Sequence, residues 1–186
     1  TLRLLPAQPP QSTVVATFAT LTAATEAILG ITGTLRPAML EFMDAVAINA
    51  VEDEMRMGLD REAAALLVAR SDAPGEFARH EAEIMVGICE KAGATEVFHT
   101  EDPEEGEAFT AARRFAIPAV EKIGPLLLED VGVPLPRLAD LVNGIAAIGA
   151  RALSRISSNS SSGSDCITIA PPAPIVVRPG RITIVR

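Results

Sequence analysis

The chain has 186 residues, a length typical of one compact domain. Apolar residues make up 48%, but aromatic residues only 3%, so the core must be built mainly from Ala, Leu, Ile and Val. The net charge of -8 at pH 7 would repel a phosphate backbone, which argues against nucleic acid as a partner. The longest uncharged stretch, residues 4–25, is rich in Pro, Gln, Ser and Thr, so we predict no membrane span there.

The predicted strands are short apolar or β-branched runs between turn residues, at 13–20, 38–43, 63–69, 95–99 and 126–133. The predicted helices have apolar residues at three- and four-residue spacing, at 21–31, 44–52, 74–93, 103–123 and 136–153. Asp44 is expected to cap the second helix. In the third helix, Phe77, Ile84 and Ile88 are expected to line one face.

This alternation of strands and helices would usually indicate a parallel, doubly wound sheet. However, no glycine-rich phosphate loop follows any strand, and several connections are short enough for antiparallel neighbours. We therefore predict an α+β fold, with an antiparallel sheet covered by helices. The expected type is ferredoxin-like (split βαβ), present once or in duplicate.

The composition changes near residue 157. We predict one domain over residues 1–156, followed at 157–186 by a Ser-rich linker and a Pro-rich tail. Residues 166–170 and 181–185 alternate like strands and are expected to form a terminal hairpin or an edge strand.

Two arginines in the fourth predicted helix point in different directions. Its apolar stripe contains Phe109, Ala112, Ala116, Val120 and Ile123. Arg113 lies at the edge of this stripe, whereas Arg114 and Pro118 point away from it. A buried guanidinium keeps its charge and needs a carboxylate or carbonyl partner. Spacing alone favours an internal ion pair, for example with Glu129 or Asp130, over a ligand.

The remaining candidates for metal binding or catalysis are weak. His80 and His99 lack the spacing of metal ligands, so we expect ordinary surface histidines and no metal site. Cys89 and Cys166 have no neighbouring Cys or His, which favours two unpaired thiols over a disulfide. No secretory signal is recognised, and we expect a cytoplasmic protein. The acidic run at 101–107 is expected to be the solvated start of a helix.

Three phrases in the chain resemble a known family. They are LRPAMLEFMD at 35–44, AARRFAIPAVEKIGP at 111–125 and LLLEDVGVPLPRLADLV at 126–142. Together they resemble the C-terminal domain of FAD-linked oxidases, of the glycolate oxidase catalytic subunit and D-lactate dehydrogenase type. The resemblance covers residues 2–148, and three phrases in the same order are more specific than any one of them.

The resemblance implies that the chain is a cap over a flavin. FAD would be bound by a separate domain, expected before Thr1, and the cap would close over a small 2-hydroxy acid such as glycolate or D-lactate. Arg113 occupies the family's position for binding the substrate carboxylate, with Arg114 as the fallback if the helix is rotated. Glu129 and Asp130 would orient Arg113 or form the pocket wall.

The chain also departs from the family pattern. The family continues into a His-Ala-Gly-Asp-Gly-Asn motif and a second His, which supply metal ligands and the catalytic base, whereas this chain continues into serines at 160–162. The resemblance therefore implies that the chain alone binds no FAD and is inactive. The alternative is a non-catalytic α+β binding or regulatory module.

Overall fold

The computed structural model describes residues 11–124, 128–131, 133–159, 175–178 and 181–185. Its strands form one antiparallel sheet in the order β4-β1-β3-β2-β6-β7-β5. The strands are β1 (Ser12–Phe18), β2 (Met39–Asp44), β3 (Ala65–Ser71), β4 (Ala94–Thr100), β5 (Leu128–Val131), β6 (Ile175–Arg178) and β7 (Arg181–Val185).

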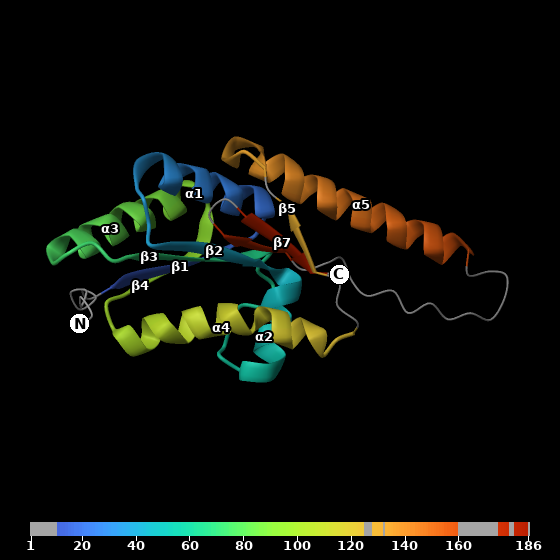
Figure 1. The fold of residues 1–186 in the computed structure, drawn as a ribbon, viewed down its shortest axis with the longest axis horizontal. Coiled ribbons are helices and arrows are strands. Elements are labelled where there is room, and N and C mark those ends of the chain that lie inside the picture. The colour runs from blue at the N-terminus through green and yellow to red at the C-terminus, as the bar shows by residue number, and fades with distance from the viewer. Residues whose placement is uncertain (1–10, 125–127, 132, 160–174, 179–180, 186) are drawn as a thin grey trace, which may run out of the picture.

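Helices cover both faces of this sheet (Figure 1). They are α1 (Leu21–Thr34), α2 (Ala45–Met55), α3 (Glu76–Lys91), α4 (Pro103–Glu121) and α5 (Leu138–Asn159). One face carries α1, α3 and α5, and the other carries α2 and α4. The result is a three-layer arrangement with a separate apolar core on each side of the sheet.

The topology confirms the predicted ferredoxin-like fold class. Strands β1 and β2 are joined by α1 and have β3 between them, while β3 and β4 are joined by α3 and have β1 between them. Two split βαβ units therefore interlock in one antiparallel sheet. Helix α2 is added between β2 and β3, and it packs beside α4 on the opposite face from α1 and α3.

Burial on both sides explains why β1 carries apolar or β-branched residues along most of its length. Val14 and Phe18 belong to the core with α1 and α3, whereas Val15 belongs to the core with α2 and α4. Every residue of β1 is buried. Side chains alternate between the two faces of a strand, so a strand covered on both faces shows no polar alternation.

The predicted cap is confirmed, and the most buried face of α3 differs from the apolar face expected from the sequence. Asp44 accepts a hydrogen bond of 3.0 Å from the N–H of Ala47. In α3 the buried residues are Ala78, Ala82, Met85 and Cys89. Phe77 is 69% exposed, while Ile84 and Ile88 are half-buried. The helix starts only after Gly75, and its buried residues are small apart from Met85.

The C-terminal hairpin lies inside the sheet. The strand predicted at 181–185 is confirmed as β7, and it pairs with both β5 and β6. Strand β6, which was not predicted, pairs with β2 through Phe42–Val177 and Met43–Val176. Helix α5 continues to Asn159, past the predicted start of the Ser-rich linker. The strand predicted at 166–170 lies outside the described residues.

Candidate functional site

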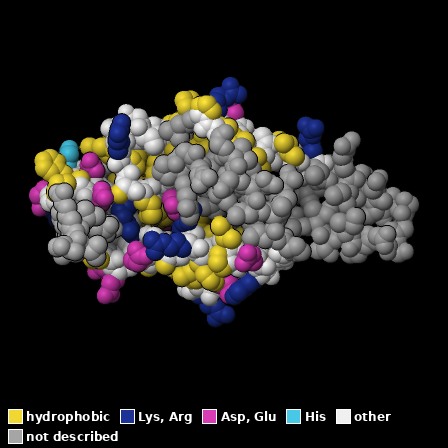
Figure 2. Space-filling view, viewed as in Figure 1, with side chains coloured by type: hydrophobic (Ala, Val, Ile, Leu, Met, Phe, Trp, Pro, Cys, Tyr) yellow, Lys and Arg dark blue, Asp and Glu magenta, His cyan; other side chains and the backbone are white. Residues whose placement is uncertain are grey.

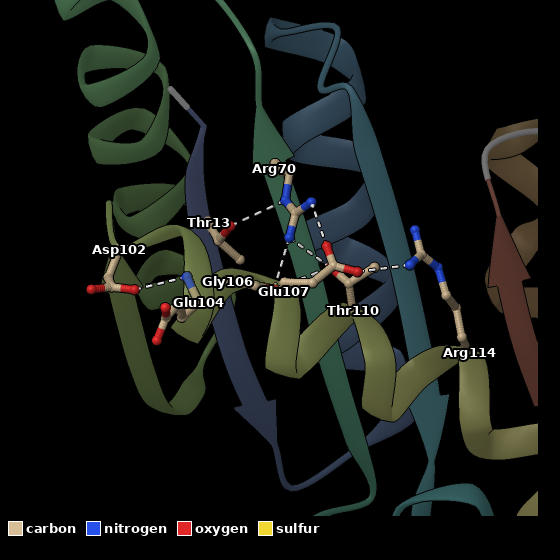
Figure 3. A network of polar contacts seen from close by, with 8 residues as sticks. All are labelled: Thr13, Arg70, Asp102, Glu104, Gly106, Glu107, Thr110 and Arg114. Atoms are coloured by element: carbon tan, nitrogen blue, oxygen red, sulfur yellow. Dashed lines mark hydrogen bonds and ion pairs between the residues drawn. The ribbon is translucent and has the colours of Figure 1, made fainter. Parts of the chain in front are cut away.

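Helix α4 carries the residues singled out from the sequence, and its start is fixed by a side-chain cap. Asp102 accepts hydrogen bonds from the N–H groups of Glu104 and Glu105, at 2.8 and 3.2 Å, and Figure 3 shows the bond from Glu104. Pro103 occupies the first turn, where its missing N–H costs nothing. The exposed acids that follow favour the positive end of the helix dipole, as predicted for this run.

The two neighbouring arginines of α4 point in the predicted directions. The Arg113 side chain is 5% exposed, whereas the Arg114 side chain is 66% exposed. Arg114 forms an ion pair of 2.7 Å with Glu107 on the outer surface of the helix. The helical period thus separates one buried guanidinium from one solvated guanidinium.

Arg113 pairs with an internal carboxylate, that of Glu41 on β2. The Glu41 side chain is 14% exposed. Glu41 lies two residues before Met43, which belongs to the core under α2 and α4, so both project toward α4. The predicted partners Glu129 and Asp130 lie on β5, opposite β7, and their side chains lie outside the described part of the chain.

Arg70, at the end of β3, is a buried arginine that sequence reasoning missed. It donates hydrogen bonds to the Thr13 hydroxyl (3.2 Å), the Gly106 carbonyl (2.7 Å) and the Thr110 hydroxyl (2.6 Å). Figure 3 shows these groups gathered around its guanidinium. The Glu107 carboxylate also lies 3.6 Å from Nη1 of Arg70. This network ties the first half of α4 to the sheet. The sequence does carry one signal for it, because Arg70 is a charged residue directly after the apolar run predicted as a strand at 63–69.

A cavity of about 430 Å³ opens between α4, strands β1 and β4, and the loop before β3. Ligand sites in proteins have volumes of roughly 300–1,000 Å³, so the cavity is large enough for a small molecule. Its lining consists of Val15, Thr17, Met57, Gly58, Leu59, Asp60, Leu66, Glu96, Phe98, Glu105, Ala108 and Phe109. Arg113 is not among them.

Glu52 organises the loop that forms one wall of this cavity. Its carboxylate accepts hydrogen bonds from the N–H groups of Met57 (2.9 Å), Gly58 (3.1 Å) and Leu59 (3.0 Å). The bond from Leu59, supported by those from Gly58 and Met57, lowers the pKa of Glu52 against the opposing effect of its burial. Sequence reasoning took Glu52 only as the end of a helix.

The histidines and Cys89 lie at separate places in the described part of the chain. In the described ranges, no group of three or more His, Cys, Asp and Glu side chains is placed to hold an ion. His80 is 69% exposed, as expected of a surface histidine. His99 is only half exposed, because the alternation of β4 turns it toward the side of α3. Cys89 is buried and unpaired, and Cys166 lies outside the described residues.

The cavity beside α4 does not fit a flavin. The cavity is lined by three carboxylates and by no Lys or Arg, so it would repel the pyrophosphate of FAD.

Figure 2 shows the described acidic and basic side chains interspersed on one face of the molecule. No helix in the described part of the chain is both long and apolar enough to cross a bilayer.

An antiparallel sheet with helices on both faces agrees with the fold class expected from the sequence resemblance. The sequence pattern described as "FAD linked oxidases, C-terminal domain" matches residues 7–158. The chain therefore belongs to this family.

Two relatives of known name are similar over most of the chain. The glycolate oxidase subunit GlcD of Bacillus subtilis (strain 168) is 32% identical over 152 residues, which are 81% of this chain and 32% of that protein. GlcD of Escherichia coli (strain K12) is 33% identical over 150 residues, which are 80% of this chain and 30% of that protein. The chain thus spans about a third of the length of these relatives.

Solved structures agree on the fold. Alkyldihydroxyacetonephosphate synthase superposes with a TM-score of 0.63 at 12% identity, over 97% of this chain and 35% of that one. The 4-ethylphenol oxidase of Gulosibacter chungangensis gives a TM-score of 0.51 at 14% identity, over 99% of this chain and 40% of that one. At such low identity these likenesses concern the fold alone.

Proposed function

We propose that the chain is the substrate cap of an FAD-dependent 2-hydroxy-acid dehydrogenase or oxidase. The observation that carries this proposal is the similarity to two glycolate oxidase subunits over four-fifths of the chain. The reaction would oxidise a small 2-hydroxy acid, such as glycolate or D-lactate, to the 2-oxo acid. FAD would be held by a flavin-binding domain acting with this cap, since the cavity beside α4 would repel its pyrophosphate.

In this proposal Arg113 binds the substrate carboxylate. A guanidinium has five N–H donors in a planar fork, so it can serve two carboxylates at once. The Glu41 carboxylate at its Nε would hold the fork in one orientation. Burial of the pair strengthens this electrostatic contact relative to water. Arg114 is a poorer candidate, because its side chain lies on the outer surface of α4.

The chain's own contribution would be binding and orientation. Holding a small acid in one pose lowers the entropy cost of reaching the transition state. Electron transfer would depend on the flavin-binding domain. We therefore expect the chain purified alone to be colourless and to oxidise no hydroxy acid.

A chimera tests the proposal. Residues 7–158 of this chain would replace the matching segment of the Bacillus subtilis GlcD subunit, and oxidation of glycolate and D-lactate would be followed with an artificial electron acceptor. We expect measurable oxidation of at least one of them. A chimera that folds and binds flavin but oxidises neither acid would instead support a non-catalytic binding or regulatory module.

The role of Arg113 is tested in the same chimera. Arg113→Lys keeps the charge but removes the planar fork, so kcat/KM should fall by about tenfold or more while flavin content is unchanged. Arg114→Lys is the matched control on the adjacent, exposed position and should leave kcat/KM within about twofold. Equal effects of the two substitutions would remove Arg113 from the substrate site.

A further inference from the structure

The cavity beside α4 is a separate feature from the Arg113 site. It lies on the face of the sheet covered by α2 and α4, and it is lined from the first half of α4 by Glu105, Ala108 and Phe109. The opposite wall is the loop containing residues 57–60. Nothing in the proposed oxidation of a hydroxy acid uses these residues.

Both walls of the cavity are held in place by buried charged side chains. Glu52 binds three consecutive N–H groups of the loop wall, from Met57 to Leu59. Arg70 binds Gly106 and Thr110, which flank the lining residues of α4. Because each wall is anchored by several hydrogen bonds, the cavity is preformed and little ordering would be needed on binding.

The lining combines an aromatic platform with negative charge. Phe98 of β4 and Phe109 of α4 form a tilted pair with ring centroids 5.9 Å apart. Asp60, Glu96 and Glu105 add carboxylates at the edge of the cavity, and its lining contains no Lys, Arg or His. An apolar body with a positively charged end complements this surface, and an anion does not.

We propose that this cavity binds a small aromatic amine. The ring of the ligand would pack against Phe98 and Phe109, and its ammonium group would lie among the carboxylates of Glu96 and Asp60. The anionic substrate proposed for the Arg113 site would be repelled by the same carboxylates. The two sites therefore have opposite charge preferences, and this inference does not depend on the proposed enzymatic function.

A pair of matched probes tests the charge preference. Phenethylamine and hydrocinnamate share a phenyl ring and a two-carbon chain but carry opposite charges. Each would be titrated into the full chain while backbone amide NMR spectra are recorded. We expect saturable shifts at Gly58, Leu59, Phe98 and Phe109 with phenethylamine, and binding of hydrocinnamate weaker by more than about tenfold.

Two substitutions locate the binding. Ala108→Trp fills the cavity from an exposed helical position and should abolish saturable binding of phenethylamine. Glu96→Gln removes one carboxylate and should weaken binding by about threefold. Glu83→Gln, on the exposed side of α3, is the matched control and should leave affinity unchanged.

The proposal is overturned by any of three results. These are the absence of saturable phenethylamine binding, equal affinity for the two probes, or unchanged affinity in the Ala108→Trp variant. Thermal unfolding of each variant would establish that the protein is folded, and Glu96→Gln tests the site without changing its volume.

Discussion

The guanidinium of Arg113 on α4 and the carboxylate of Glu41 on β2 form an ion pair within the interface between helix and sheet. Both side chains are removed from most of the solvent, at 5% and 14% exposure. At such low exposure the attraction between the two charges offsets part of the free-energy cost of removing each from water. The pair therefore has a structural consequence whether or not Arg113 also binds substrate.

Removing one member of this pair should be strongly destabilising. We expect Glu41→Leu to lower the free energy of unfolding by about 3–5 kcal/mol, because it removes the carboxylate that pairs with the buried Arg113 guanidinium. The double variant Glu41→Leu/Arg113→Met should recover most of that loss, since both charges are gone. Urea denaturation followed by circular dichroism measures both.

An exposed ion pair provides the control. Asp53 and Arg61 are 2.8 Å apart, with side chains 68% and 47% exposed. Asp53→Leu should cost less than about 1 kcal/mol, as is usual for solvated pairs. If Glu41→Leu cost no more than Asp53→Leu, the Arg113–Glu41 pair would have no special structural role.

Gly106 tests the packing of α4 against β1. Alanine is normally favoured over glycine in a helix by about 1 kcal/mol. At position 106, however, a Cβ would lie 2.7 Å from the Thr13 hydroxyl, which accepts a hydrogen bond from Arg70. We therefore expect Gly106→Ala to lower the unfolding temperature, with a net cost of about 1–3 kcal/mol.

Gly87 is the matched glycine, because it lies inside α3 and an added Cβ there would meet nothing within 4 Å. Gly87→Ala should raise the unfolding temperature, by a gain of up to about 1 kcal/mol. Opposite signs for the two Gly→Ala substitutions are the expected result in thermal unfolding. A stabilising effect of Gly106→Ala would show that α4 does not pack as closely as described.

The fold class was predictable from the sequence because its evidence is local. Strand and helix periods, turn residues and the absence of a phosphate loop all lie within short windows. The directions of Arg113 and Arg114 follow in the same way from the period of one helix. The pattern could not predict which face of α3 packs on the sheet. The face with Phe77 and Ile88 and the face with Ala78, Ala82, Met85 and Cys89 both follow the helical period.

The partners within the candidate site depend on contacts between residues distant in sequence. Glu41 and Arg113 lie far apart in the sequence, at positions 41 and 113, and Arg70 reaches a carbonyl 36 residues away. No period of a single element encodes such a pairing. The cavity likewise exists only where a loop, a helix and two strands meet. A lone charged residue in an apolar strand, as at Glu41 and Arg70, is the signal the sequence does carry.

Cys89 is expected to be chemically inert in the folded protein. Burial raises the pKa of its thiol to about 12, so almost no thiolate is present at neutral pH. In a Cys166→Ser variant, where Cys89 is the remaining thiol, a thiol reagent should label the native protein only as fast as the core opens. Addition of urea should accelerate labelling to the rate of a free cysteine. Rapid labelling without urea would contradict the described burial.

Glu52 should make stability depend on pH in a defined direction. Hydrogen bonds from Leu59, Gly58 and Met57 hold its pKa in the folded protein below the ordinary value of 4.5. A carboxylate with a lowered pKa stabilises the folded state above its unfolded pKa, and that contribution is lost as the pH falls through the folded pKa. Wild type should therefore exceed Glu52→Gln in stability at pH 7, and the difference should shrink toward about pH 3.

Chemical denaturation across this pH range measures the difference. Glu62→Gln is the matched control, because Glu62 lies on the same connection with an exposed side chain, and its stability profile should follow wild type. Parallel profiles for wild type and Glu52→Gln would mean that the carboxylate does not hold the loop.

The loop also forms a wall of the cavity, so Glu52→Gln should weaken phenethylamine binding at pH 7, although Glu52 itself is not a lining residue. That loss at a distance would identify Glu52 as the residue that preorganises the cavity.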